Sequence, residues 1–189
     1  MRSIKDMFSE IVTILNGSGI EYAIVGGMAV GVWGNTRTTR DVDVILLMKE
    51  DDIPKMMKEL KNSNFSVEEK DMRSALREKS HFSIFDKLSI YHADVKGAYK
   101  PNEVETVKDR QEIKMADIMI YVASPEDTIA NKLLFGREHD IKDAEGIYAR
   151  QLGNLDTEKL EQKCKKLGVY EEFIDMKKRV EKCLEEIES

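Results

Sequence analysis

Two aspartates separated by one residue stand at the start of an apolar run. Asp41 and Asp43 lie on either side of Val42, and the apolar residues Val44–Leu47 follow directly. Residues i and i+2 of a strand point to the same face, so the two carboxylates would lie together and repel each other. A divalent cation removes that repulsion, and Mg²⁺ favours carboxylate oxygens combined with substrate phosphates. An Asp-x-Asp arises about once by chance in a chain this rich in aspartate, so its position at the entrance of a strand is what indicates a metal platform.

A double glycine precedes this pair. Gly26-Gly27 follows the short apolar segment Tyr22–Val25 and comes before a second apolar segment, Met28–Trp33. Between a strand and a helix, two glycines let backbone amides approach a phosphate closely, and the helix N-terminus adds partial positive charge. The alternative is a tight turn without a ligand. The glycine pair is neither a P-loop nor a Rossmann fingerprint, because both longer motifs are absent.

The hydrophobic pattern predicts an α+β fold. Apolar residues at helical spacing predict a first helix from Ile4 to Ile14, ended by Gly17-Ser18-Gly19, and Asp51 or Asp52 caps a helix that reaches Leu60. The predicted strands cover residues 22–25, 42–47, 82–85, 88–95, 104–108 and 118–122.

From Ser124 onward the pattern is helical. Ser124 is a capping residue, Pro125 stands at the first helical position, and Asp127 comes three residues after the cap. The predicted helical segments are 129–136, 139–151, 157–167 and 170–187. We therefore expect two domains, a sheet-containing α/β domain over residues 1–123 and a helical region over residues 124–189 packed on it.

Composition excludes several classes of protein. The chain has 189 residues, 41% of them hydrophobic, which excludes a disordered chain. The net charge of −6 argues against a protein that coats nucleic acid non-specifically. Two cysteines cannot form a disulfide framework or a four-cysteine zinc site, and we expect both Cys164 and Cys183 to be buried thiols on helices. No apolar stretch suits a signal peptide or a membrane span, so we expect a cytoplasmic protein.

The combined motif resembles the DNA polymerase β-like nucleotidyltransferase superfamily. The shared pattern is an apolar residue and a Gly-Gly, then thirteen residues, then Asp-x-Asp, as in Val25-Gly26-Gly27 and Asp41-Val42-Asp43. The superfamily also has a third carboxylate on a later strand. Asp94 fits that place, and Asp86 is the alternative at an apparent turn.

A narrower resemblance is to the AbiEii-type branch, which includes toxin-like nucleotidyltransferases. That branch tends to show Arg-x-Ser/Thr-x-Asp-x-Asp, which the segment from Arg37 through Thr39 to Asp43 matches. It also has a helix that begins with Pro-Glu and contains a Lys, followed by Asp-x-x-Asp. Pro125-Glu126, Lys132 and the pair Asp140 and Asp143 supply these features.

The resemblance implies a Mg²⁺-dependent nucleotidyltransferase with the superfamily's mixed sheet. It implies that Asp41, Asp43 and Asp94 ligate one or two Mg²⁺ ions and perform catalysis. An NMP would move from an NTP to the hydroxyl of a protein, a tRNA or a small molecule, with release of pyrophosphate. The residues expected to bind the nucleotide are Gly26, Gly27, Arg37, Thr39 and Lys132.

Two other functions stay open at this point. The chain could be a binding module of the same fold that recognises nucleotide or protein without turnover. By analogy with the branch, it could instead be the toxin of a two-component system, held inactive by an antitoxin protein.

Several further residues have competing interpretations. Arg40 and Lys132 could neutralise phosphate, but in a chain this rich in charge a basic side chain is more often part of a solvated face. His92 shares a strand face with Asp94, although such a residue is more often simply packed. Trp33 could stack on a base, and core packing is the commoner role. Asp140 and Asp143 lie one helical turn apart and favour a structural role in ion pairs.

Overall fold

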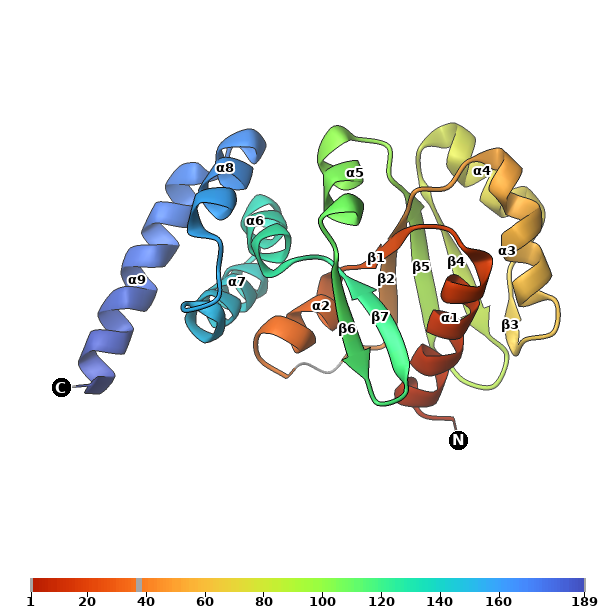
Figure 1. Cartoon of the computed structure of the whole chain (residues 1–189), viewed down its shortest axis with the longest axis horizontal. Helices are drawn as coiled ribbons and strands as arrows, with labels where there is room; N and C mark the ends of the chain where they lie inside the picture. Colours follow the sequence, from red (N-terminus) through yellow and green to blue (C-terminus); the bar gives the residue numbers. More distant parts are fainter. Residues whose placement is uncertain (1, 37–38, 189) are drawn as a thin grey trace. The chain divides into compact units, whose positions relative to one another are not determined.

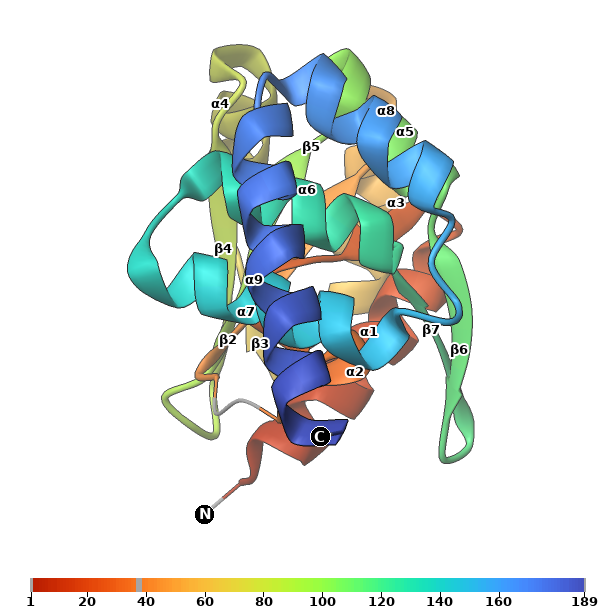
Figure 2. The same ribbon diagram turned by 90° about the vertical axis from the view of Figure 1, so that its left-hand side faces the viewer.

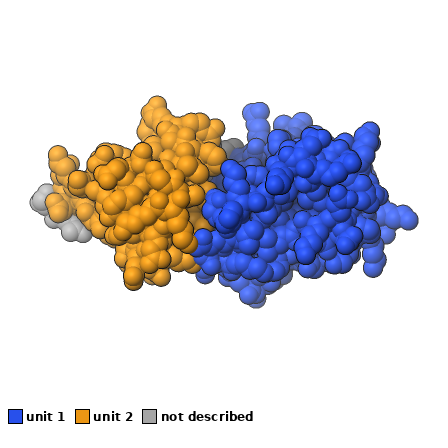
Figure 3. Space-filling model, turned by 90° about the horizontal axis from the view of Figure 1, so that it is seen from above, with its two compact units in different colours: residues 1–28, 38–123 blue, residues 29–37, 124–189 orange. Residues whose placement is uncertain are grey.

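The computed structural model describes residues 2–36 and 39–188. The chain divides into two compact units, coloured separately in Figure 3. The first unit comprises residues 1–28 and 38–123, and the second comprises residues 29–37 and 124–189. The second unit therefore includes a short segment from the connection between the first two strands.

The first unit is built on one mixed sheet. Within the described residues this sheet has seven strands in the order β3-β4-β5-β2-β1-β7-β6. The pairs β2–β5 and β1–β7 are parallel, and the other neighbours are antiparallel. The strands are β1 (Tyr22–Ile24), β2 (Asp41–Leu46), β3 (Phe65–Ser66), β4 (His81–Asp86), β5 (His92–Gly97), β6 (Gln111–Met115) and β7 (Ile118–Val122).

Helices pack against the apolar face of this sheet. α1 lies beside α3, and α4 packs on β4 and β5 (Figure 1). Along β2, the half-buried residues Asp41, Asp43 and Ile45 alternate with buried ones, so one face of the strand joins the core and the other carries the two carboxylates. The helices of this unit are α1 (Ile4–Ser18), the short 3₁₀ helix η1 (Glu50–Asp52), α3 (Ile53–Leu60), α4 (Glu69–Glu78) and α5 (Pro101–Lys108), together with the start of α2 (Gly26–Trp33).

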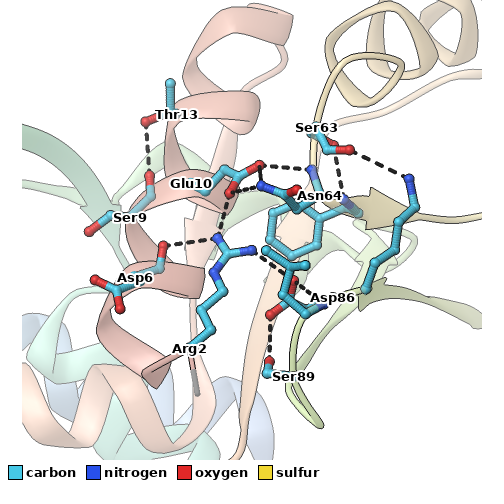
Figure 4. Close-up of polar contacts among 12 residues, drawn as sticks. Arg2, Asp6, Ser9, Glu10, Thr13, Ser63, Asn64, Asp86 and Ser89 are labelled. Atoms are coloured by element: carbon cyan, nitrogen blue, oxygen red, sulfur yellow. Dashed lines mark hydrogen bonds and ion pairs between the residues drawn. The ribbon is translucent and has the colours of Figure 1, made fainter.

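A polar cluster joins the start of the chain to the turn after β4 (Figure 4). Arg2 donates to the carboxylate of Asp86 at 2.7 Å and also pairs with Glu10 on α1. Glu10 in turn accepts the backbone N–H of Asn64 at 3.0 Å. Burial raises the pKa of Glu10, but the hydrogen bonds from Asn64 and Arg2 outweigh it and leave this pKa below its usual value. The cluster therefore ties α1 to two loops of the sheet.

The second unit is a helical bundle. Its helices are α6 (Pro125–Phe135), α7 (Glu138–Gln151), α8 (Thr157–Leu167) and α9 (Tyr170–Glu188), and Figure 2 shows α9 lying against α6 and α7. The end of α2 belongs to this bundle, because Val30 is fully buried in its core and Trp33 packs against that core. Trp33 thus has the packing role that is commoner for such a residue. Ser124 caps α6 by accepting the N–H of Asp127, as the sequence predicts.

The α+β prediction is confirmed, with local corrections. Residues 104–108 form the end of helix α5 and are not a strand. Pro101 occupies the first turn, and the Glu103 carboxylate accepts the backbone N–H groups of Tyr99 and Lys100, which fixes the helix start. β5 begins at His92, later than the expected residue 88.

The cysteines also differ from expectation. Cys164 is buried, and burial raises the pKa of its thiol to about 12. Cys183 is exposed, so the prediction that it is buried is wrong. Among the described helices, none combines the length and the apolar character that a bilayer crossing requires.

Candidate functional site

The pairing of β2 with β5 brings together residues from two parts of the sequence. In this parallel register Asp41 is opposite His92, and Asp43 is opposite Asp94. Both pairs lie on the polar face, because the residues between them, Val42 and Ala93, are fully buried. Four side chains with metal-binding or proton-binding groups therefore share one face of two neighbouring strands.

Three of these side chains form a compact donor cluster. Asp41, His92 and Asp94 each present a ligand atom, and these atoms lie within 4.8 Å of one another. His92 Nε2 is 3.5 Å from Asp94 Oδ2. The three residues are half-buried, so the cluster is open to a ligand from solvent.

Hydroxyl groups orient both carboxylates of the cluster. Thr39 Oγ1 donates to Asp41 Oδ1 at 2.7 Å, and Ser83 Oγ on β4 donates to Asp94 Oδ1 at 2.5 Å. Such bonds restrict the rotation of a carboxylate and leave its second oxygen with a defined direction. Thr39 was predicted to bind nucleotide, and that contact stays a prediction. Ser83 was not predicted as a site residue, because the polar-apolar alternation along β4 does not reveal which strand pairs with it.

Asp43 is placed against the start of helix α2. A Cβ atom on Gly26 would lie 2.0 Å from Asp43 Oδ2, so the carboxylate packs directly on the Gly26 backbone. Gly26 has φ of +61°, which an L-residue rarely adopts. The neighbouring residue Val25 donates its N–H to the backbone oxygen of Asp43 at 2.9 Å, which holds the two segments together. Gly27 is the second residue of the same helix, so the predicted double glycine forms its N-terminus.

The two alternatives for the third carboxylate have different surroundings. Asp86 belongs to the buried face of β4 and accepts hydrogen bonds from Arg2, from the N–H of Leu88 and from Ser89 (Figure 4). Asp94 lies on the polar face, opposite Asp43. The structure thus brings Asp94 together with the Asp-x-Asp pair and gives Asp86 a place in the polar cluster around Arg2.

The basic residues proposed to bind nucleotide are placed as follows. Lys132 is buried in the second unit, where its ammonium group pairs with Asp140 at 2.7 Å and with Asp143 at 2.9 Å. Arg40 is exposed. Arg37 lies outside the described residues. Any contact of Lys132 or Arg37 with a nucleotide stays a prediction.

Asp140 is a fully buried carboxylate with two cationic partners. Its Oδ2 atom also accepts a hydrogen bond from Arg137 Nε at 2.6 Å. Burial raises the pKa of Asp140, but Arg137 and Lys132 overcome this effect and leave it below the usual value. Asp140 and Asp143 therefore act in ion pairs, as the sequence pattern favours.

The donor set of the cluster suits a divalent cation. Two carboxylates and an imidazole are common ligands of divalent metals, and the close spacing brings their charges together. The residues present can therefore hold such an ion on the polar face of β2 and β5.

Comparisons with known proteins identify a family and a shared fold. A family model described as "Nucleotidyltransferase of unknown function (DUF6036)" matches residues 2–183. A search of curated proteins found no match. Among solved structures, an antigenic nucleotidyltransferase-like protein from Paracoccidioides brasiliensis has 18% identity and a TM-score of 0.61, over 94% of this chain and 91% of that one.

Two antibiotic-modifying enzymes share the fold. ANT(2")-Ia in complex with adenylyl-2"-tobramycin has 14% identity and a TM-score of 0.56, over 85% of this chain and 94% of that one. The lincomycin-bound lincosamide antibiotic adenylyltransferase LnuA has 16% identity and a TM-score of 0.50, over 77% and 96%. At these identities the likeness shows a common fold. The family match spans almost the whole chain, and the protein belongs to this family of nucleotidyltransferases.

Proposed function

We propose that the protein transfers an NMP from an NTP to an acceptor hydroxyl and releases pyrophosphate, with a divalent cation such as Mg²⁺. The observation that supports this most is the β2–β5 register, which aligns Asp41, Asp43 and Asp94 on one face. Nucleotidyl transfer asks little covalent chemistry of a protein, because it depends on positioning and on neutralising charge. Family membership supports the same reaction class.

Each residue has a separate part in this reaction. Asp41 and Asp43 hold the cation, and the backbone at Gly26 and Gly27 receives the triphosphate at the N-terminus of α2. Asp94 completes the cation site and orients the acceptor hydroxyl or accepts its proton. The acceptor oxygen then bonds to the α-phosphorus, and the bond from that phosphorus to the β-phosphate oxygen breaks. When bound, the cation neutralises charge on the triphosphate and on the leaving pyrophosphate.

The chemical identity of the acceptor is also part of this proposal. The fold is shared with two enzymes whose structures contain adenylyl-2"-tobramycin or lincomycin, which makes small hydroxyl-bearing compounds the first acceptors to test. The net charge of −6 gives tRNA less support. A protein hydroxyl is the third class of acceptor, and self-modification of the chain is its simplest case.

The AbiEii-type lineage and a role as an antitoxin-controlled toxin are also proposals. They rest on the Arg-x-Thr-x-Asp-x-Asp pattern from Arg37 to Asp43 and on the resemblance that it carries. A small gene beside this one whose product binds the chain and blocks nucleotide turnover would support this role.

The first test measures thermal unfolding with Mg²⁺ and each of the four NTPs. A ligand present at 100 times its dissociation constant stabilises a fold by about 2.7 kcal/mol, which is a readily measured shift. We expect one NTP to give that shift only with Mg²⁺. The double variant Asp41→Asn, Asp43→Asn should keep the fold and lose the shift. A double variant that binds Mg-NTP like the wild type contradicts the site assignment.

A matched pair of variants distinguishes the two choices of third carboxylate. Asp94→Asn should unfold near the wild-type midpoint and lose the NTP-dependent shift. Asp86→Asn should unfold earlier, because it weakens the buried pair with Arg2, and should keep the shift. The reverse pattern would transfer the assignment to Asp86. Release of pyrophosphate on addition of an acceptor then tests turnover.

A further inference from the structure

The polar face of β2 and β5 carries an imidazole as well as carboxylates. We propose that His92 is a direct ligand of the bound cation beside Asp41 and Asp94, and that the site therefore prefers a first-row transition cation, such as Mn²⁺ or Co²⁺, to Mg²⁺. This inference rests on the cation site of the proposed function and specifies its chemistry.

The distances suit a shared ion. Two donors that are about 2.1 Å from one ion, on adjacent octahedral corners, are about 3.0 Å apart. His92 Nε2 and Asp94 Oδ2 are 3.5 Å apart, and all three donor atoms lie within 4.8 Å. Small side-chain rotations therefore bring the three donors onto one ion, while the paired strands keep their register.

The surroundings already orient all three donors. Ser83 and Thr39 each donate a hydroxyl hydrogen bond to one oxygen of a carboxylate. The imidazole of His92 packs on the ring of Phe85, its register partner on β4, with 5.8 Å between centroids and 31° between planes. Outer hydrogen bonds and packing of this kind fix the direction of metal ligands and tune their affinity.

The presence of an imidazole nitrogen among the carboxylate oxygens determines which divalent cation the site prefers. Mg²⁺ takes oxygen ligands and keeps several waters, so an imidazole adds little to its binding. Imidazole nitrogen binds first-row transition cations well, and affinity for a given site rises from Mn²⁺ towards Cu²⁺. An imidazole added to the carboxylates of the proposed cation site therefore favours Mn²⁺ or Co²⁺ over Mg²⁺.

The test is pulsed electron paramagnetic resonance of the protein loaded with Mn²⁺ alone. A coordinated imidazole adds a ¹⁴N modulation to the signal of the bound Mn²⁺. When the histidines are labelled with ¹⁵N, this modulation should be replaced by that of ¹⁵N. The chain has three histidines, so the signal can be assigned by substitution. His92→Gln should lose the modulation and bind Mn²⁺ at least tenfold more weakly, with Mg²⁺ affinity nearly unchanged.

A matched control comes from the neighbouring strand. His81 on β4 is exposed and pairs in register with Lys96, outside the donor cluster. His81→Gln should keep both the modulation and the Mn²⁺ affinity. If His92→Gln does not fold, the ¹⁵N-labelled wild type shows whether an imidazole coordinates, and His81→Gln combined with His139→Gln assigns that imidazole to His92 by elimination.

The outcomes separate this inference from the proposed function. Mn²⁺ that binds without nitrogen modulation, or binds no more tightly than Mg²⁺, overturns the role of His92 and leaves the carboxylate site intact. If neither cation binds, with or without NTP, the cation site of the proposed function is itself wrong.

Discussion

At the scale of single residues, Gly26 is the most constrained position near the site. Its φ of +61° suits glycine, and a Cβ there would meet the Oδ2, Cγ and Cβ atoms of Asp43. We predict that Gly26→Ala lowers the free energy of unfolding by roughly 1–2 kcal/mol from backbone strain alone. It should also displace the Asp43 carboxylate, and the thermal shift with Mg-NTP should disappear.

Gly31 in the same helix is the control for this substitution. Apart from the two neighbouring residues and the nearby backbone of its own helix, no described atom lies within 4 Å of a Cβ placed there. Gly31→Ala should therefore leave NTP binding unchanged and raise the free energy of unfolding by about 0.4–1 kcal/mol in a denaturant titration. Equal behaviour of the two variants would mean that the contact between Gly26 and Asp43 has no role.

Part of the site could be predicted residue by residue. The i, i+2 rule placed Asp41 with Asp43, and His92 with Asp94, on common faces. The sequence did not predict that these two pairs lie next to each other, because that depends on which strands pair and in which register. Ser83 and Phe85 were missed for that reason, since their proximity to β5 is a property of the sheet.

At the scale of elements, a buried ion pair joins α6 to α7. Lys132 has an ammonium group held by Asp140 and Asp143, and the Asp140 side chain is fully buried. Removing one partner of a buried pair leaves an uncompensated charge and typically costs about 3–5 kcal/mol. Arg137 still pairs with Asp140 when Lys132 is replaced, so we predict that Lys132→Met loses at most that amount, measured by denaturant unfolding at neutral pH.

The pH dependence of this variant gives a second measurement. The pKa of Asp140 is lowered in the folded state, so its contribution to stability is complete above its ordinary value near 3.8 and is lost as the pH falls through the lower folded value. The wild type should lose stability over that acid range. Lys132→Met should lose less, because only Arg137 then favours the ionised carboxylate.

Lys142 supplies the comparison on α7. It forms an exposed pair with Glu138, which water screens, so the pair contributes little to stability. Lys142→Met should therefore unfold like the wild type. A Lys132→Met protein that is as stable as Lys142→Met would show that the buried pair contributes little to holding the two helices together.

Elements with clear end signals were predicted well. Ser124, Pro125 and Asp127 fixed the start of α6, because a capping hydroxyl and a proline act locally. The segment 104–108 was misread because its valines favour a strand, whereas the capping contacts of Glu103 start a helix. Helix α4 was missed because it buries few apolar residues, chiefly Met72 and Ala75.

At the scale of the whole molecule, the helical bundle includes a segment from the N-terminal part of the chain. Val30 is fully buried in the core of the second unit, and Trp33 packs against that core. We predict that a chain ending at Ala123 exposes both residues, lowers the unfolding midpoint and associates in solution. Size-exclusion chromatography and binding of a hydrophobic dye measure these effects. A monomeric shortened chain with the wild-type midpoint would contradict this division of the molecule.

The parallel register of β2 and β5 also has a consequence for how the site forms during folding. Asp41 and His92 are neighbours in the sheet but about fifty positions apart in the chain, because η1, α3, β3, α4 and β4 intervene. The nascent protein therefore assembles its donor cluster only after this long-range pairing. Repulsion between the carboxylates opposes that pairing. We predict that a cation that relieves this repulsion slows the unfolding of the sheet, which stopped-flow unfolding with and without Mn²⁺ measures.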